Sequence, residues 1–190
     1  MSWTRQIAAA EAADALNSVY EHIRSRSSRG SVSNLWQAQS LDPNGLEAAY
    51  GLYEKLMGNP APLTAAQAEM LALVVSATNG CTYCVAHHGP KLAKALDDAA
   101  LAHAIAMDYR ESDINARDRV LLDYAIALTC EPSERKLEDV ERVREYGLDD
   151  AMIVRATEIV AYYNMINRVA SSLGVELEEG VSEWEYGSQK

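Results

Sequence analysis

The chain has 190 residues, a formal net charge of −11 and a pI near 4.8, with 48% hydrophobic and 24% charged residues. These values are ordinary for one soluble globular domain, and the negative charge argues against nucleic acid, whose phosphates such a surface repels. No apolar run approaches the roughly 20 residues that span a bilayer, and the acidic N-terminus does not resemble a signal peptide. We therefore expect a cytoplasmic protein that binds neither nucleic acid nor membrane.

Apolar residues at helical spacing predict helices through the first 60 residues. The pattern covers residues 6–26, breaks at the polar segment 25–31 and resumes in a short helix around residues 34–38. Asp42 and Pro43 are typical of a helix start, because Asp caps free N–H groups and Pro fits the first helical position. The stripe that follows ends at Gly58, so we expect a helix between these points.

The next segment is predicted to be the central helix. Thr64 and Gln67 fit a capping box that opens a helix over residues 65–79, which is apolar on more than one side. Gly80 is well placed to end this helix in the left-handed conformation, so that the next helix starts at the cysteines. Pro90 cannot donate a backbone hydrogen bond, which predicts a kink or break just after His88.

The second half of the chain also shows helical periodicity, with helices expected from Asp97 through Met107 and over residues 115–130, 137–146 and 149–174. Cys130 ends an apolar stretch and is expected to be a buried, inert residue. The acidic run 176–179 is interpreted as part of a solvated, partly ordered tail. No segment alternates as a strand would, so the sequence predicts an all-α fold in a single domain.

One motif carries chemistry: Glu69 is followed by Cys81, Cys84 and His88. Cysteines three residues apart can close a disulfide in the first turn of a helix, where the N-terminal N–H groups stabilise a thiolate. On a continuing helix His88 shares a face with both cysteines, and Glu69 reaches the same place from the preceding helix. A carboxylate, an imidazole and a dithiol in one place are interpreted as a redox active site.

Alternative interpretations of these residues remain open. The cysteines could be a vestigial pair or half of a zinc site, although the only other ligand pair nearby is the adjacent His87 and His88. His88 could be a structural buried histidine, and Glu69 a solvated carboxylate. His87 points about 100° away around the helix, which favours a structural role or a subunit contact.

The pattern Glu-x11-Cys-x2-Cys-x3-His, with NGCTYCVAHHG and the later YYNMINRVASSLGV, resembles the AhpD-like alkylhydroperoxidases of the carboxymuconolactone decarboxylase superfamily. The resemblance to longer, peroxidase-related members runs from Asn34 to Gly174. It implies an AhpD-like helical bundle over residues 34–174, with a helical extension at residues 1–33 and the acidic tail at residues 175–190. Such bundles assemble as trimers or hexamers.

The resemblance also implies a thiol-dependent peroxidase that reduces organic hydroperoxides. Cys84 would attack the peroxide, Cys81 would resolve the product, and Glu69 and His88 would relay protons. Tyr83 stands where the best-studied peroxidase has a histidine, so Tyr83 and the extra imidazole of His87 are possible auxiliary residues. No metal or cofactor is expected. The electron donor would be a dithiol, such as a lipoyl protein or a thioredoxin-like protein.

Three other functions are kept as alternatives. A general thiol–disulfide oxidoreductase would use the same pair on protein disulfides. A carboxymuconolactone-type decarboxylase would need acid and base groups but no dithiol, so the Cys-x-x-Cys pair argues against it. A non-catalytic oligomeric helical protein would keep the scaffold without turnover.

Overall fold

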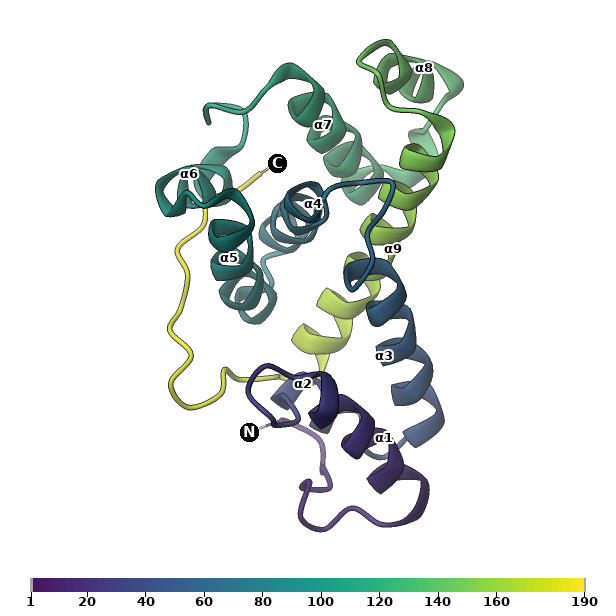
Figure 1. Cartoon of the computed structure of the whole chain (residues 1–190), viewed down its shortest axis with the longest axis vertical. Coiled ribbons are helices and arrows are strands. Elements are labelled where there is room, and N and C mark those ends of the chain that lie inside the picture. The colour runs from purple at the N-terminus through teal and green to yellow at the C-terminus, as the bar shows by residue number, and fades with distance from the viewer. Residues whose placement is uncertain (1, 190) are drawn as a thin grey trace.

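The computed structural model of the chain describes residues 2–189, and all regular structure in that range is helical (Figure 1). Within it lie nine α-helices and one 3₁₀ turn: α1 (Asp14–Arg26), α2 (Asn34–Gln37), α3 (Pro43–Met57), α4 (Ala65–Thr78), α5 (Thr82–Leu96), α6 (Ala99–Asp108), α7 (Ala116–Cys130), η1 (Pro132–Glu134), α8 (Leu137–Glu145) and α9 (Asp150–Ser172). The prediction of an all-α chain is confirmed. Within residues 2–189 no helix combines the length and apolar character needed to cross a bilayer.

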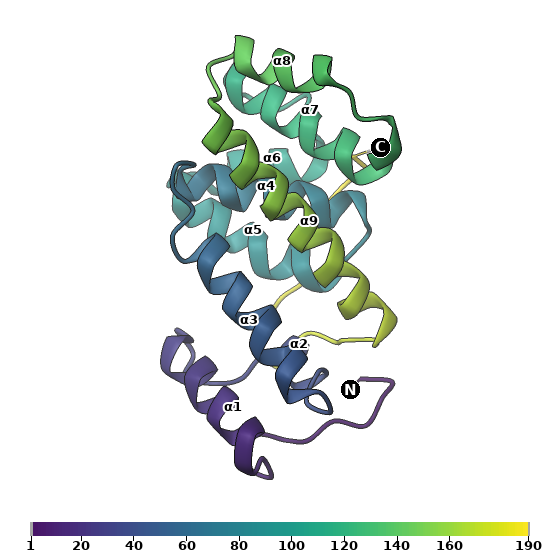
Figure 2. The same ribbon diagram turned by 90° about the vertical axis from the view of Figure 1, so that its right-hand side faces the viewer.

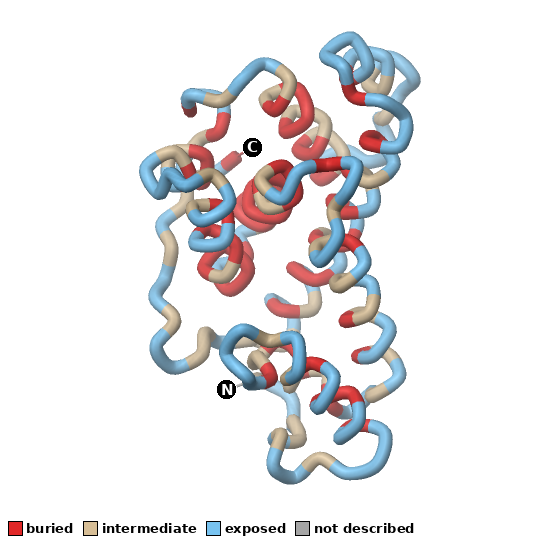
Figure 3. Tube along the Cα trace, viewed as in Figure 1, coloured by how far each residue is buried: buried red, intermediate tan, exposed pale blue. Residues whose placement is uncertain are grey.

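Helix α4 lies at the centre of the bundle and is buried along nearly its whole length (Figure 3). A helix that is apolar on all sides is stable only when other elements surround it, and α4 packs against α5, α6, α7 and α9. Figure 2 shows the long helix α9 crossing the α4 and α5 layer. The capping box is present, because the Gln67 N–H donates to Thr64 and the Gln67 side chain accepts from the Thr64 N–H.

A tight hairpin joins α4 to α5 and places the cysteines at the start of α5. Gly80 has a φ of +68°, a left-handed conformation that glycine adopts without strain. The Cys81 N–H donates to the Ser76 carbonyl at 2.9 Å, and Cys81 is the N-cap of α5. Both the glycine turn and the helix start at the cysteines agree with the sequence prediction.

Of the kink or break predicted just after His88, the break is wrong, because α5 continues through Pro90 to Leu96. A proline inside a helix removes one hydrogen bond and costs roughly 3 kcal/mol. Packing of α5 against both α4 and α6 offsets that loss. The helix therefore carries the cysteines, both histidines and Lys91 on one continuous element.

The N-terminal helix is shorter than predicted, since α1 begins at Asp14 and not near residue 6. The preceding segment uses its backbone groups in contacts with other parts of the chain. The Ile7 N–H donates to Ser40, and the Ala9 carbonyl accepts from Arg24. Helix α1 packs beside α3, as both views of the ribbon show (Figures 1 and 2).

Two predictions about the rest of the chain are corrected. Cys130 is exposed and not buried, because it is the last residue of α7. The acidic tail has no helix, yet it is held to the bundle as it passes α2, α5 and α6 (Figure 1). Glu178 is bonded to three residues, Trp184 lies against Gly89, and the Gly187 N–H donates to the Ala106 carbonyl. At Glu178 the tail is therefore a packed part of the structure.

Candidate active site

The two cysteines lie at the first turn of α5 as free thiols, with exposures of only 2% for Cys81 and 3% for Cys84. A hydrogen bond with Cys84, working against burial, lowers the pKa of Cys81 to about 7. The same hydrogen bond, together with burial, raises the pKa of Cys84 well above its usual value. Two thiols that interact this strongly titrate as a pair, and the hydrogen bond between them favours ionisation of the Cys81 sulfur.

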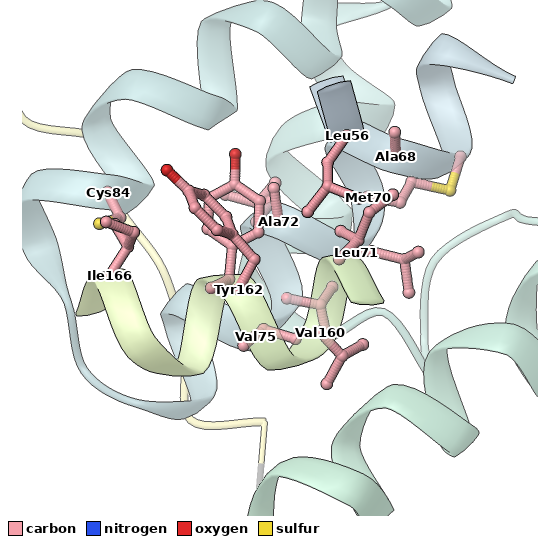
Figure 4. Close-up of a cluster of buried hydrophobic side chains, with 14 of the residues drawn as sticks. Leu56, Ala68, Met70, Leu71, Ala72, Val75, Cys84, Val160, Tyr162 and Ile166 are labelled. Atoms are coloured by element: carbon pink, nitrogen blue, oxygen red, sulfur yellow. The ribbon is translucent and has the colours of Figure 1, made fainter. Parts of the chain in front are cut away.

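Buried polar side chains from α4 and α9 surround the sulfurs. Asn167, only 1% exposed, donates from Nδ2 to the Ser76 hydroxyl at 2.9 Å. Hydrogen bonds from Ser171 and Asn167 help to lower the pKa of Cys81, after the larger effects of Cys84 and burial. Figure 4 draws Cys84 in one cluster with Tyr162 and Ile166 of α9, so that α9 forms one side of the site.

Glu69 of α4 and His88 of α5, hereafter the inner pair, are in direct contact. The Nδ1 atom of His88 lies 2.6 Å from Oε2 of Glu69, and the side chains are 7% and 13% exposed respectively. Burial would raise the pKa of Glu69, but the charge that His88 carries when protonated, its hydrogen bond and the charge of Lys91 lower it overall. Burial also lowers the pKa of His88 and outweighs the Glu69 carboxylate.

The proton positions in the inner pair follow from these shifts. An ionised carboxylate can only accept hydrogen bonds, so Nδ1 of His88 carries the proton and donates it to Glu69. A neutral imidazole has one protonated nitrogen, which leaves Nε2 of His88 as a proton acceptor. The hairpin at Gly80 therefore builds a base held in one orientation by a buried carboxylate.

A second carboxylate–imidazole contact, hereafter the tail pair, joins Glu178 of the tail to His87. Their Oε2 and Nε2 atoms are 2.9 Å apart. The other oxygen of Glu178 accepts from the Tyr83 hydroxyl at 2.6 Å and from the Asn34 N–H at 2.7 Å. Burial would raise the pKa of Glu178, but hydrogen bonds from His87, Tyr83 and Asn34 lower it to about 2. The Tyr83 hydroxyl therefore donates its proton in a hydrogen bond to Glu178.

Both pairs adjoin one cavity of about 410 Å³. Among the described residues, its wall includes Cys84 but not Cys81, together with His87, His88 and Glu178. The remaining wall has six aromatic side chains from four elements, α2, α3, α5 and α9: Trp36, Tyr50, Tyr53, Tyr83, Tyr162 and Tyr163. The cavity thus combines aromatic side chains with one sulfur and two imidazoles on α5, and serine and arginine residues within the segment 26–33 also line it.

The structure brings together all six residues that the sequence singled out. The Glu69–His88 contact needs no intervening water, and His87 shares the cavity wall with His88 although it faces another direction around α5. Within residues 2–189 no three metal-binding side chains gather, so the zinc alternative has no ligand set there.

Sequence reasoning missed Glu178, Asn167 and Lys91. Asn167 had a signal, because a polar residue interrupts the apolar stripe of α9. Lys91 had no such signal in the sequence. In the structure its ammonium donates to the Tyr53 hydroxyl at 3.0 Å. Glu178 stands in a run of acidic residues, and nothing in that run distinguishes the carboxylate that turns inward.

Comparisons with known proteins identify a family and several solved structures that this chain resembles. Residues 43–108 match the model of the carboxymuconolactone decarboxylase family. A peroxidase-related protein from Silicibacter sp. TM1040 is 31% identical, with 89% of this chain and 90% of that one covered and a TM-score of 0.79. An AhpD-core peroxidase-related protein from Ralstonia eutropha JMP134 is 26% identical, with 94% and 93% covered and a TM-score of 0.84.

A third solved structure shares the fold alone. The debrominase Bmp8 is 17% identical, with 94% of this chain and 95% of that one covered and a TM-score of 0.76. A comparison with curated proteins gives no match.

The fold and the site define an all-helical protein of the AhpD-like class, with a Cys-x-x-Cys pair at a helix start and a buried carboxylate–imidazole contact beside it. The predicted AhpD-like helical bundle is confirmed. The chain belongs to the carboxymuconolactone decarboxylase superfamily, among its AhpD-like members.

Proposed function

We propose that the protein is a thiol-dependent peroxidase that reduces small organic hydroperoxides. The observation that carries this proposal is that Cys84 and His88 line the same cavity. Glu69 holds the His88 ring in its orientation through the hydrogen bond at Nδ1. A thiol becomes a nucleophile when a base removes its proton. Membership of the superfamily and the peroxidase-related relatives support the same class of reaction.

The reaction would proceed in two balanced steps. His88 Nε2 takes the Cys84 proton, and the thiolate attacks one peroxide oxygen, so that an S–O bond forms, the O–O bond breaks and the leaving alkoxide takes the proton as an alcohol. Cys81 then loses its proton and its thiolate attacks the Cys84 sulfenic acid, so that an S–S bond forms, the S–O bond breaks and the released hydroxide takes up the Cys81 proton as water. Both sulfurs lie in one helical turn, so the second step is intramolecular.

Two observations bear on which sulfur attacks. The pKa of about 7 favours Cys81 as the first thiolate, whereas only Cys84 is among the residues that line the cavity. A sulfur that cannot touch the peroxide cannot attack it, so we assign the attack to Cys84 and resolution to Cys81. Because the thiolate is the reactive form, and the Cys81 hydrogen bond and burial raise the pKa of Cys84, the oxidation rate should keep rising with pH above 7.

Relative rates with hydroperoxides and with protein disulfides separate this function from a general thiol–disulfide oxidoreductase. A lactone decarboxylase would not use the dithiol. A non-catalytic protein would show a thiol pair of ordinary pKa and no turnover.

Stopped-flow oxidation by cumene hydroperoxide and hydrogen peroxide tests the proposal, with free thiols counted before and after. Oxidation should remove the Cys81 and Cys84 thiols and give one disulfide between them. Cys81→Ser should still react once and accumulate sulfenic acid, whereas Cys84→Ser should lose the fast reaction. The reverse pattern would exchange the two roles, and a disulfide elsewhere would refute the proposal.

The proposal includes partners. A dithiol donor, such as a lipoyl protein or a thioredoxin-like protein, would reduce the disulfide again. We also propose a closed homo-oligomer, a trimer or hexamer, because exposed apolar side chains on α3 and α9 offer area for subunit contacts. Leu52, Val154 and Met165 are 44%, 57% and 42% exposed. Light scattering that gave a monomer at micromolar concentration would contradict the assembly.

A further inference from the structure

The carboxylate of Glu178, in the tail, has three hydrogen-bond partners within the protein. It contacts α5 through Tyr83 and His87 and the start of α2 through the Asn34 N–H, at 2.6, 2.9 and 2.7 Å. Its side chain is 19% exposed and is part of the cavity wall. A second bond, from the Asn34 side-chain amide to the Glu176 carbonyl at 3.0 Å, holds the same stretch of tail.

Further anchors hold the tail along α5 and α6. The Trp184 ring lies so close to Gly89 that a Cβ there would come within 2.5 Å of it. Near residue 189 the Gln189 amide donates to the Ala106 carbonyl at 2.7 Å, and Arg110 donates to the Gln189 carbonyl at 2.9 Å. Glu178 is thus held on an anchored segment that keeps it in place against the cavity.

The hydrogen bonds of the tail pair fix a proton position opposite to that of the inner pair. A carboxylate whose pKa is about 2 is ionised at neutral pH and can only accept. Nε2 of His87 must therefore carry a proton and donate it to Glu178, whereas in His88 the proton is on Nδ1. The ring nitrogen of His87 that is left for a bound molecule is Nδ1. Two consecutive histidines thus present opposite ring nitrogens.

We infer that Glu178 is a positioning residue of the active site, which fixes the ring of His87 in the cavity wall so that the site has a second oriented imidazole besides His88. The inference rests on the proposed peroxidase function. A hydroperoxide brings its own O–H group, and its products bring an alcohol and water, so the cavity needs polar partners apart from the base that activates Cys84. His87 is such a partner, and the C-terminal tail determines its orientation.

A double-mutant cycle between Glu178 and His87 tests this role. Glu178→Gln should slow oxidation of Cys84 by about tenfold or more, since a hydrogen bond to a charged group is worth roughly that factor. His87→Gln should slow it at least as much, and the double variant should be no slower than His87→Gln alone, because a positioning residue acts only through its partner. Glu179→Gln, at an exposed neighbour in the same tail, is the matched control and should leave the rate unchanged.

Two outcomes of that cycle would overturn the inference. If Glu178→Gln leaves the rate unchanged, the tail carboxylate has no part in the reaction. If the effects of the two variants multiply, Glu178 does not act through His87. Helical circular dichroism on all four proteins establishes that the comparison is between folded chains.

A second readout is independent of the peroxidase reaction. In Glu178→Gln the amide oxygen can stay with the Tyr83 and Asn34 donors, which turns the NH₂ group toward His87 and requires Nε2 to become an acceptor. Nitrogen-15 spectra of the imidazoles should therefore show the proton of His87 moving from Nε2 to Nδ1, with no such change in Glu179→Gln. An unchanged His87 spectrum would refute the positioning role, whereas a wild-type protein inert to hydroperoxides with the expected spectra would refute the peroxidase function alone.

Discussion

The inner pair and the tail pair use the same two residue types, yet they are built in different ways. Glu69 reaches His88 across a helical hairpin, and the two side chains are separated by 19 residues of sequence. Glu178 reaches His87 across 91 residues, from a tail that has no helix of its own. One contact follows from the packing of two central helices, while the other depends on many small contacts along the surface.

This difference teaches that sequence neighbours need not share an environment. His87 and His88 are adjacent on α5, but each takes its proton position from a carboxylate on a different element. Burial lowers the pKa of His88, and the Glu69 carboxylate only partly opposes that effect. The inner pair is therefore suited to accept a proton, and the tail pair is suited to hold a ring in place.

The largest expected effect comes from breaking the inner pair. Glu69→Gln and His88→Ala should each slow oxidation of Cys84 by roughly 10² to 10⁴, the usual range for loss of a general base. The double variant should be little slower than the worse single variant, because members of one relay are not additive. Stopped-flow kinetics measures all three rates, and Glu47→Gln, on the exposed face of α3, serves as the control. Effects that multiplied would mean that Glu69 and His88 do not work as a unit.

An acid titration should sharpen the comparison by releasing the tail. The pKa of Glu178 is lowered from 4.5 to about 2, so its stabilisation is complete above pH 4.5 and is lost as the pH falls through about 2. Partial exposure screens the interaction, which leaves about 1 to 2 kcal/mol for the tail contact. The hydrogen-exchange protection of the segment 175–189, taken relative to the intrinsic exchange rate at each pH, should therefore fall over this range in the wild type.

The matched variant isolates the carboxylate in that titration. Glu178→Gln has no charge to lose, so its tail should be less protected from exchange at neutral pH and should lose little further protection in acid. Equal acid sensitivity in both proteins would show that other carboxylates, and not Glu178, hold the tail.

A smaller effect is expected from Gly89→Ala, which disturbs the tail without touching an acid or a base. The added methyl group would meet the Trp184 ring at 2.5 Å, so the ring must move. Because alanine favours a helix by up to about 1 kcal/mol over glycine, α5 itself should not be weakened. The rate should fall by a few-fold, and Gly89→Ala with Trp184→Ala should recover part of the loss. A fall as large as that of His88→Ala would mean that the substitution reaches the inner pair.

The smallest effect is expected from Cys130→Ser. This thiol lies at the end of α7, away from the cavity that Cys84 lines. The fast phase of oxidation and the closure of the Cys81–Cys84 disulfide should be unchanged, as mass spectrometry and stopped-flow traces would show. A slower fast phase would place Cys130 in the reaction and contradict the proposed thiol pair.

The parts of the molecule that could be predicted from sequence are those with local causes. The capping box at Thr64, the glycine turn at Gly80 and the helix start at the cysteines depend on a few adjacent residues, and the structure has all three. Helical spacing and the motif were enough to bring Glu69 and His88 to one site, because the hairpin between them is short.

The remaining features depend on contacts between distant segments. Pro90 stays helical because α4 and α6 pack against α5, and residues 6–13 leave the helix because Ser40 and Arg24 bind their backbone. The inward turn of Glu178 needs donors from α2 and α5 at once. The residues next to Glu178 in the sequence do not indicate these distant partners, so the contact between Glu178 and His87 could not be predicted.

Because Cys130 is exposed, the products of oxidation should depend on the protein concentration. Closure between Cys81 and Cys84 is unimolecular, so its extent under oxidant does not depend on how much protein is present. A surface thiol meets its partner only on another molecule, so any coupling through Cys130 is second order and grows with the square of the concentration. Dilute samples under oxidant should therefore stay as single chains on a non-reducing gel, while concentrated samples should accumulate a covalently linked pair of chains that Cys130→Ser abolishes.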